Sequence, residues 1–232
     1  SAMPVAALLL ALQGCASTPA GGNAQANDPI ESWNRTMFGF NESLDENVLK
    51  PVATGYTKVV PSVARTGVTN FYNNFQDAWS AVNSFLQGKF ENGGINTMRV
   101  ITNTTLGVGG LFDWATEMRM ERHTEDFGQT LGAWGFDAGP YVVWPLLGPS
   151  TLRDSFGLPL DIAASPSTFI DSTPWAIGVG VLQVIDTRAG LLGTTNLLDD
   201  IVIDKYVFVR DGHLQRRRSL VYDGNPPESK AT

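Results

Sequence analysis

The chain has 232 residues, of which 43% are hydrophobic, a formal net charge of -7 and one cysteine. A chain of this length can bury a substantial core and is expected to form one domain. The negative charge argues against a nucleic-acid partner, because binders of the phosphate backbone usually carry a basic face. Cys15 lies outside the expected folded body, which excludes a disulfide, a cysteine-rich zinc site and a thiol nucleophile within that body.

Residues 1–15 are interpreted as a short cloning remnant followed by an export signal. The apolar run Val5–Leu12 has the length of a signal-peptide core and is far short of the roughly 20 residues that span a bilayer. It ends in Leu12-Gln13-Gly14-Cys15, which resembles the bacterial lipobox, although Gln13 departs from the small or hydroxyl residue usual there. Cys15 is therefore predicted to become an acylated lipid anchor. The alternative is an apolar terminus without processing.

The residues around the body are assigned by composition. Lipoproteins retained in the inner membrane usually carry Asp after the cysteine, and this chain carries Ala16, so the outer membrane is the predicted destination. Residues 16–27 are small or polar and uncharged, which is typical of a flexible tether. The body is expected to cover residues 28–223 and a disordered tail residues 224–232.

The body is predicted to be all-α. Asp28 and Pro29 have the residue types of an N-cap and a first helical position. Apolar residues then recur at helical spacing, namely Trp33, Met37, Phe40 and Leu44. Further helical patterns cover residues 62–86, 94–104, 126–134, 150–164, 173–192 and 197–221. Two β-branched segments, Val59–Val63 and Tyr206–Val209, suit short strands but lie beside helical signals.

Three stretches have an unusual composition for a water-soluble helical protein. Leu106–Trp114, Gly139–Gly148 and Trp175–Ile185 are apolar, rich in Gly or Pro and nearly uncharged. The longest proline-free apolar run, Trp175–Leu182, is too short to cross a bilayer, but such segments can enter one leaflet. Aromatic residues near their ends favour the membrane interface. The alternative is that the three stretches are ordinary core helices, and composition does not decide between the two.

Metal binding and common nucleophile motifs find little support. The two histidines, His123 and His213, are far apart in the chain, and Glu121, Glu125 and Asp126 are interpreted as a solvated charged segment rather than as zinc ligands. No Gly-x-Ser-x-Gly elbow occurs. No metal, cofactor or enzymatic activity is expected.

Two charged features remain open at this point. The acidic pairs Asp199-Asp200 and Asp154 with Asp161 have residue types suited to acid–base chemistry, but such residues are more often helix caps and solvated faces. The cluster Arg216-Arg217-Arg218 suits lipid headgroups or an acidic partner surface. The alternative for this cluster is an ordinary exposed helix end.

Ordered motifs over most of the body are similar to those of one family. They are Asp28-Pro29-Ile30-Glu31-Ser32-Trp33-Asn34-Arg35, Phe40-Asn41, Arg65 to Phe71, Asn103 to Gly110 with Asp113, Asp126-Phe127-Gly128-Gln129-Thr130-Leu131-Gly132, Gly139-Pro140-Tyr141 and Gly148 to Asp154. In this order and spacing they resemble the MlaA/VacJ lipoproteins of Gram-negative outer membranes. The resemblance extends from Asp28 to about Asp223.

The resemblance implies a ring-like bundle of helices in the inner leaflet of the outer membrane, facing the periplasm, around a central amphipathic channel. It implies removal of mislocalised phospholipid from the outer leaflet, which maintains lipid asymmetry. The implied partners are phospholipid, an outer-membrane porin trimer and a soluble periplasmic lipid carrier. No cofactor and no covalent step are implied.

The resemblance also assigns channel residues by position. Phe40 and Asn41 match an element near the channel, and Gly135 and Gly139 match its glycine-rich segment. The alternatives are helix packing for Phe40 and turn geometry for the glycines. Lys205 stands where relatives often have Pro, which leaves the end of the preceding helix uncertain.

Two rival functions stay open. One is a structural lipoprotein that supports a porin and carries no lipid. The other is a phospholipid hydrolase, for which only the membrane location speaks. Porin binding without lipid would favour the first, and release of fatty acid would favour the second.

Overall fold

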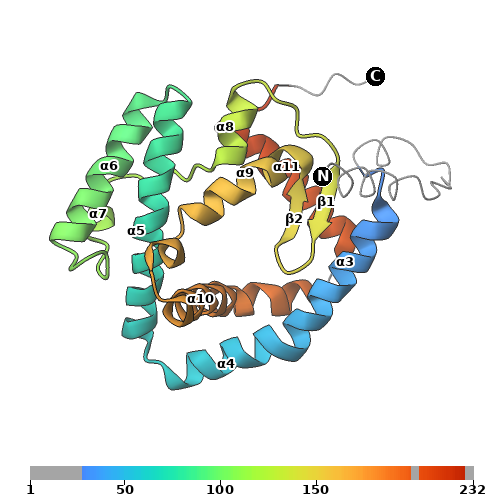
Figure 1. Cartoon of the computed structure of the whole chain (residues 1–232), viewed down its shortest axis with the longest axis horizontal. Coiled ribbons are helices and arrows are strands. Elements are labelled where there is room, and N and C mark those ends of the chain that lie inside the picture. The colour runs from blue at the N-terminus through green and yellow to red at the C-terminus, as the bar shows by residue number, and fades with distance from the viewer. Residues whose placement is uncertain (1–27, 200–203, 228–232) are drawn as a thin grey trace, which may run out of the picture.

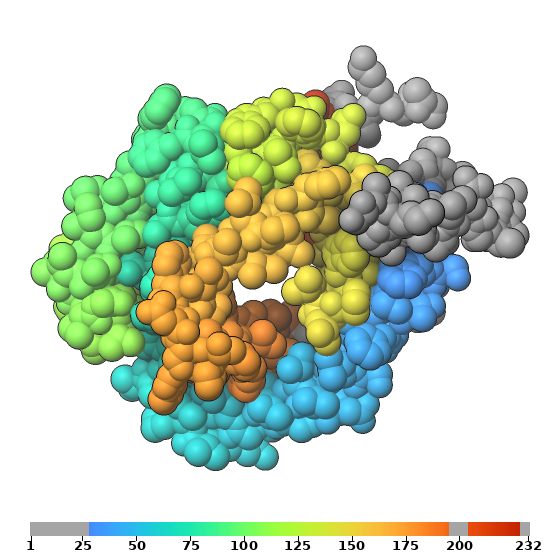
Figure 2. All heavy atoms as spheres, viewed as in Figure 1, coloured from blue at the N-terminus to red at the C-terminus, as the bar shows by residue number. Residues whose placement is uncertain are grey.

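The computed structural model describes residues 28–199 and 204–227, and in it the helices form a ring (Figure 1). Figure 2 shows an opening through the middle of this ring. The predicted all-α class is confirmed, apart from one small hairpin. The elements in chain order are α3 (Glu31–Leu44), η1 (Asp45–Leu49), α4 (Lys50–Val59), α5 (Ser62–Leu86), α6 (Phe90–Thr105), α7 (Trp114–Glu117), α8 (Phe127–Ala133), β1 (Tyr141–Trp144), β2 (Gly148–Thr151), α9 (Leu152–Ala163), η2 (Pro166–Phe169), α10 (Thr173–Asp199) and α11 (Lys205–Val221).

Neither β-branched segment forms the short strand that its composition suits, in agreement with the all-α prediction. Residues 206–209 lie inside α11, and residues 59–63 are the junction between α4 and α5. The junction is a break because Pro61 lacks an amide proton and disfavours a helical conformation in the residue before it. Val60 is accordingly extended, with φ -91° and ψ 122°.

The lower side of the ring is a nearly continuous rod that the sequence patterns did not predict beyond Leu44. It consists of α3, the π-helical turn η1 and α4 (Figure 1). Pro51 sits at the start of α4, where a missing amide proton does little harm. The rod therefore passes a proline that would otherwise predict a helix end.

Asp28 is not the N-cap that the sequence predicted. The residue before α3 is Ile30, which provides no side-chain cap. Asp28 is buried instead and accepts hydrogen bonds from Asn34 Nδ2, at 2.7 Å, and from the Tyr206 hydroxyl. Arg210 lies 3.4 Å from the same carboxylate. Asp28 therefore joins α3 to α11 and helps to close the ring.

The stretch Gly139–Gly148 forms most of an antiparallel β-hairpin rather than a core helix. Tyr141 pairs with Thr151, and Trp144 pairs with Gly148. Tyr141 and Val143 are fully buried and pack with Tyr206 in the small apolar core. β1 is therefore part of the core, although as a strand and not as the helix that the alternative interpretation expected, whereas the hairpin tip is exposed at residues 146 and 147.

Helices α5 and α6 form the most extensive helix pair, and their shared interior is polar. Arg99 of α6 is 1% exposed and donates from Nε to Asp77 of α5, at 3.1 Å. Its Nη2 reaches both carboxylate oxygens of Asp113, at 3.2 and 3.1 Å. Asp77 also pairs with Arg122, at 2.5 Å. Charged side chains at this depth persist because they neutralise and hydrogen-bond each other.

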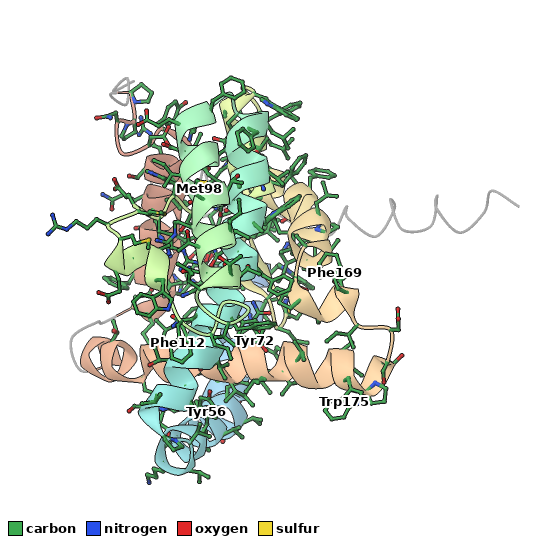
Figure 3. All side chains as sticks on the ribbon, turned by 90° about the vertical axis from the view of Figure 1, so that its left-hand side faces the viewer. Tyr56, Tyr72, Met98, Phe112, Phe169 and Trp175 are labelled. Carbon is green, nitrogen blue, oxygen red and sulfur yellow. The ribbon has the colours of Figure 1, made fainter. Side chains whose placement is uncertain are left out.

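Over the described residues, polar and apolar side chains are distributed in nearly the opposite way to those of a water-soluble protein. The buried side chains are mostly polar or charged, while many large apolar side chains are exposed. Figure 3 shows Phe169 and Trp175 at one side of the molecule, and these rings are 70% and 73% exposed. An exposed apolar surface of this extent needs an apolar environment to cover it. It fits a bilayer better than water.

Helix α10 is longer than the sequence patterns suggested. It has 27 residues, and its stretch Thr173–Thr194 is long and apolar enough to cross a membrane by length and composition. Only 11% of this stretch is buried. The apolar run Trp175–Leu182 is itself too short to cross a bilayer, as expected, but it lies within this longer stretch. Asp186 and Arg188 lie within the stretch, and both are bound to side chains of other helices.

Candidate functional site

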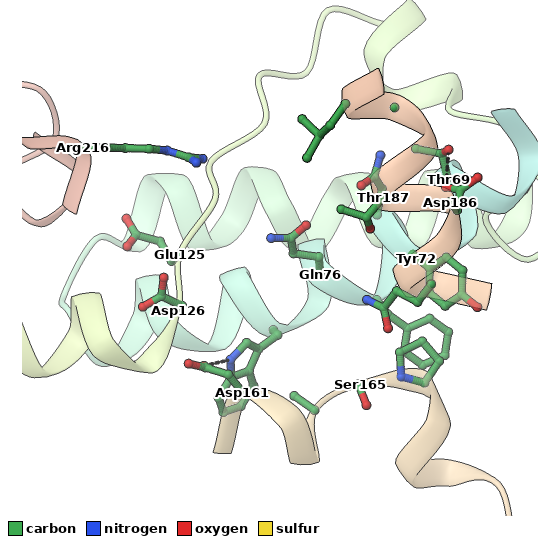
Figure 4. Close-up of a pocket in the computed structure, with 18 residues that line it drawn as sticks. Thr69, Tyr72, Gln76, Glu125, Asp126, Asp161, Ser165, Asp186, Thr187 and Arg216 are labelled. Carbon is green, nitrogen blue, oxygen red and sulfur yellow. Dashed lines mark hydrogen bonds between the residues drawn. The ribbon is translucent and has the colours of Figure 1, made fainter. Parts of the chain in front are cut away.

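A cavity of about 760 Å³ lies inside the ring between α5, the α8–α9 side, α10 and α11 (Figure 4). Its wall mixes polar groups with a few apolar ones. α5 and α10 supply most of the wall, at spacings of three or four residues that place these side chains on one face of each helix. The lining residues from these two helices are Thr69, Tyr72, Asn73, Phe75, Gln76, Trp79, Gln183, Asp186, Thr187, Gly190 and Leu191.

Each of the carboxylates that line the cavity has a partner within the described chain. Asp186 accepts from the Tyr56 hydroxyl at 2.9 Å and from Thr69 Oγ1 at 2.7 Å. Burial and this hydrogen bond raise the pKa of Tyr56 to about 12, so its hydroxyl remains a donor. Glu125 is nearly fully buried and pairs with Lys89 at 2.8 Å. The acidic groups thus hold the wall together.

Asp161 is held by two neutral donors and, among the described residues, by no cation. It accepts from Trp79 Nε1 at 2.7 Å and from the Phe127 amide at 2.9 Å. Burial raises the pKa of Asp161, and the two hydrogen bonds only partly oppose this. Asp154 is seven residues away and pairs with Arg217 instead. The two carboxylates thus have separate partners, and Asp161 lines the cavity.

The segment around His123 is not the solvated charged segment that the sequence suggested. Glu125 is buried, and Asp126 caps α8 through the Gln129 amide at 2.8 Å. Burial opposes ionisation of Asp126, but Arg217 outweighs it and lowers its pKa. Among residues 28–199 and 204–227, no group of three or more His, Cys, Asp or Glu is placed to hold a metal ion.

The basic cluster on α11 divides into three different environments. Arg217 is partly buried and donates to Asp126, at 2.5 and 2.9 Å, and to Asp154, at 2.8 Å. Arg218 is exposed and contacts the Pro227 carbonyl. Arg216 lines the cavity. Neither a binding surface nor an ordinary exposed helix end describes all three arginines, because Arg217 forms ion pairs inside the protein.

Asn41 connects α3 to the hairpin loop. Its Nδ2 donates to the Trp144 carbonyl at 2.9 Å, and its Oδ1 accepts from the Leu146 amide at 2.8 Å. Leu146 has a positive φ of 67° and depends on such external support. Phe40, the preceding residue, is 50% exposed. Asn41 therefore fixes the loop that borders the central opening (Figure 2).

The two glycines are explained by local backbone geometry. Gly135 has φ 93° and ends α8 in a Schellman motif, in which the Phe136 amide donates to the Leu131 carbonyl at 3.0 Å. Gly139 has φ 67°, and a Cβ there would lie 3.1 Å from the Leu152 side chain. Neither residue lines the cavity, nor do Phe40 and Asn41.

Sequence reasoning missed most of the cavity wall, although a signal was present. On α5, Thr69, Tyr72, Asn73 and Gln76 repeat at helical spacing, and on α10 so do Gln183, Asp186 and Thr187. A polar stripe along an otherwise apolar helix is the usual mark of a lumen or a helix contact in lipid. Of the other predicted sites, Cys15 and Asp200 lie outside the described residues, as does the side chain of Asp199.

Known proteins resemble this chain over most of its length. The family model "MlaA lipoprotein" matches residues 26–220. The intermembrane phospholipid transport system lipoprotein MlaA of Shigella flexneri is 39% identical over 222 residues, which is 92% of this chain and 85% of the relative. The protein of the same name from Haemophilus influenzae is 34% identical, over 95% of this chain and 90% of the relative.

An uncharacterised protein of Rickettsia typhi is 31% identical, over 88% of this chain and 82% of the relative. A solved structure, from work on the maintenance of bacterial outer membrane lipid asymmetry, superposes with a TM-score of 0.73 at 39% identity. This match covers 84% of this chain and 98% of the solved chain. The chain therefore belongs to the MlaA lipoprotein family.

Proposed function

We propose that this protein is an outer-membrane lipoprotein that takes mislocalised phospholipid from the outer leaflet through its ring and passes it to a soluble periplasmic carrier. Several relatives are named for intermembrane phospholipid transport. The observation that carries the proposal is the polar-lined cavity inside a ring whose outer side chains are largely apolar. A purely structural lipoprotein has no need of such a cavity.

The mechanism rests on solvation. Moving a charged headgroup through the apolar midplane of a bilayer costs far more than the hydrophobic effect returns for a few methylenes. A polar wall removes this cost, since Gln76, Gln183 and Thr187 offer hydrogen bonds in place of water. The acyl chains can follow along the apolar residues of the ring. No bond is made or broken in this process.

The proposed placement is the inner leaflet of the outer membrane, with Cys15 as the acylated anchor, residues 16–27 as tether, residues 28–223 as the ring and residues 224–232 as tail. A porin trimer is the proposed neighbour. The exposed aromatic and aliphatic side chains of α10 and η2 support contact with lipid. A Cys15→Ala variant is expected to take up no fatty-acid probe.

The experiment that tests the function is identification, by mass spectrometry, of every lipid and protein that co-purifies with the acylated full-length chain. Intact phospholipid together with a porin is the expected result. A porin without phospholipid would favour the structural lipoprotein. Lysophospholipid or free fatty acid would favour a hydrolase.

The channel role of Phe40, Asn41, Gly135 and Gly139 needs variants with matched controls. Asn41→Ala releases the hairpin loop, whereas Asn47→Ala removes only a hydrogen bond to Ser43, one turn back in the same rod. We expect outer-leaflet phospholipid to change in the first variant alone.

Gly135→Leu is paired with Gly224→Leu. Both glycines have positive φ and open space around the position of a Cβ, so the backbone strain of the two variants is similar. Lipid clearance that fails only in Gly135→Leu supports the channel role. Equal lipid clearance by the two variants would show that Gly135 serves only to end α8.

A further inference from the structure

We infer that Arg216 binds the phosphate diester of a phospholipid headgroup inside the ring. The inference rests on the proposed function and adds a specific contact to it. Arg216 extends from α11 into the cavity, opposite the wall that contains Tyr72 and Ser165 (Figure 4). It is the one basic residue in the described lining of this cavity.

Arg216 differs from the other charged groups of the wall in having no partner. Within residues 28–199 and 204–227, no hydrogen bond or ion pair joins Arg216 to another residue. The carboxylates around the same space are already bound, Glu125 by Lys89 and Asp126 by Arg217. Arg216 is solvent-exposed, and an accessible guanidinium that borders a polar cavity without a counterion is placed to receive an anion.

The adjacent Arg217 differs from Arg216, because it is bound to two carboxylates. Arg217 has its carboxylates in place and fixes α11 to α8 and α9. Since α11 is held in this way, the adjacent Arg216 is presented to the cavity by a rigid helix. The planar guanidinium fork matches the two oxygens of a phosphate diester.

The apolar part of the wall favours a lipid over a free phosphate ion. Phe75 and Pro166 line the same cavity. The Phe75 ring continues to Phe169, with ring centroids 6.3 Å apart, and Phe169 is largely exposed on the outside of the ring. A cation in the cavity, together with two neighbouring aromatic rings that reach the surface, suits a headgroup with an acyl chain.

The test measures lipid binding by the full-length protein and three variants, Arg216→Ala, Arg216→Lys and Arg218→Ala. Two lipids with identical acyl chains serve as probes: phosphatidylglycerol, which carries the phosphate, and diacylglycerol, which lacks it. Each is titrated in mixed micelles. Arg218→Ala is the matched control, because it removes the same charge from the same helix outside the cavity.

Arg216→Ala is expected to weaken phosphatidylglycerol binding about ten-fold, as for loss of one charge-assisted hydrogen-bonded contact, and to leave diacylglycerol binding unchanged. Arg216→Lys should keep part of the affinity, since it retains the charge but not the planar fork. Arg218→Ala should bind both lipids like the wild type. This pattern is specific to recognition of the phosphate.

Two lipid-binding results would overturn the inference while leaving the transport function intact. In the first, Arg216→Ala and Arg218→Ala bind phosphatidylglycerol with equal affinity. In the second, Arg216→Ala loses affinity for phosphatidylglycerol and for diacylglycerol to the same extent. Inorganic phosphate titrated by calorimetry separates the sources of the anion. Arg216-dependent binding of inorganic phosphate without an effect on phosphatidylglycerol also overturns the inference. A wild type that binds neither lipid contradicts the proposed function itself.

Discussion

The α5–α6 pair and α10 use their side chains in opposite ways. Between α5 and α6 the charged groups are buried and bound to each other, with Arg99 at the centre. α10 turns the apolar residues Ile177, Val181 and Val184 outward, at helical spacing, and directs Gln183 and Asp186 to the cavity. The first region is stabilised by internal hydrogen bonds, and the second depends on what surrounds the ring. The comparison separates effects on folding from effects on membrane binding.

Arg99→Met should have the largest effect on folding. It removes the hydrogen bonds to Asp77 and Asp113 and leaves these carboxylates short of a counterion. We expect the free energy of unfolding to fall by about 3–5 kcal/mol. Denaturant titration in a fixed detergent, followed by circular dichroism, measures it. The control is Arg35→Met, whose exposed pairs with Glu31 and Asp204 predict a loss below about 1 kcal/mol. Equal losses would show that burial of the ion pairs is unimportant.

Asn34→Leu tests the polar contacts that close the ring on the other side. Asn34 is fully buried, donates to Asp28 at 2.7 Å and to the Tyr141 carbonyl at 2.9 Å, and accepts from the Val143 amide at 2.8 Å. Loss of these bonds leaves buried groups unsatisfied, and we expect a cost of about 2–4 kcal/mol. Asn47→Leu, in the exposed π-helical turn, should cost much less. A native-like midpoint for Asn34→Leu would contradict the assigned role.

The pH dependence of stability should report His213. Its side chain is partly buried beside Tyr141, and burial together with Arg217 and Arg216 lowers its pKa to about 4, against the opposing charges of Asp154 and Asp126. Because the unfolded state then binds a proton at higher pH than the folded state, stability is full above about pH 6.5 and falls as the pH drops toward 4.

We expect a loss of about 1–2 kcal/mol over this window, after allowance for solvent screening. Unfolding titrations at a series of pH values measure it, and the slope between pH 6.5 and 4 should flatten in His213→Phe. Asp126, whose pKa is lowered, begins to add to the loss only at the acid end of this window, below about pH 5. An unchanged slope in the variant would assign the acid loss to other groups.

Val181→Asp should have the smallest effect on folding and a clear effect on membrane association. Val181 is 52% exposed on the outer face of α10, so the free energy of unfolding in detergent should change by less than about 0.5 kcal/mol. Partition into phospholipid vesicles should weaken, because a carboxylate in hydrocarbon is costly. Val181→Leu serves as control for the change of side chain. Unaltered flotation with vesicles would place this face of α10 outside the bilayer.

The sequence predicted the helices best where the chain follows simple helical rules. α5 begins at Ser62 and ends at Leu86, as its apolar periodicity indicated, because Pro61 separates it from α4. The hairpin was missed for a physical reason. Its first strand, Tyr141–Trp144, is apolar throughout, and the second contains Gly148 and Pro149, so neither alternates in the way that marks a strand.

The cavity wall was harder to predict because it depends on pairing between helices far apart in sequence. Thr69 and Asp186 meet across the wall at 2.7 Å, and nothing local to either residue indicates the other. Asp28 shows the same limit, since its local sequence suggested a helix cap and its partner Tyr206 lies near the other end of the body. The family resemblance, which is confirmed, supplied the ring that local patterns did not.

The polar interior has a consequence for the temperature dependence of stability. The heat capacity of unfolding grows with newly hydrated apolar surface and is reduced by polar surface. In this chain the buried set is rich in Asn, Ser, Thr and charged residues, and the apolar exterior is hydrated or detergent-covered in both states. Calorimetry should therefore give a heat-capacity increment below the roughly 12–15 cal/mol/K per residue of water-soluble domains. The stability curve would be correspondingly flat, so the ring should keep its shape over a wide range of growth temperatures.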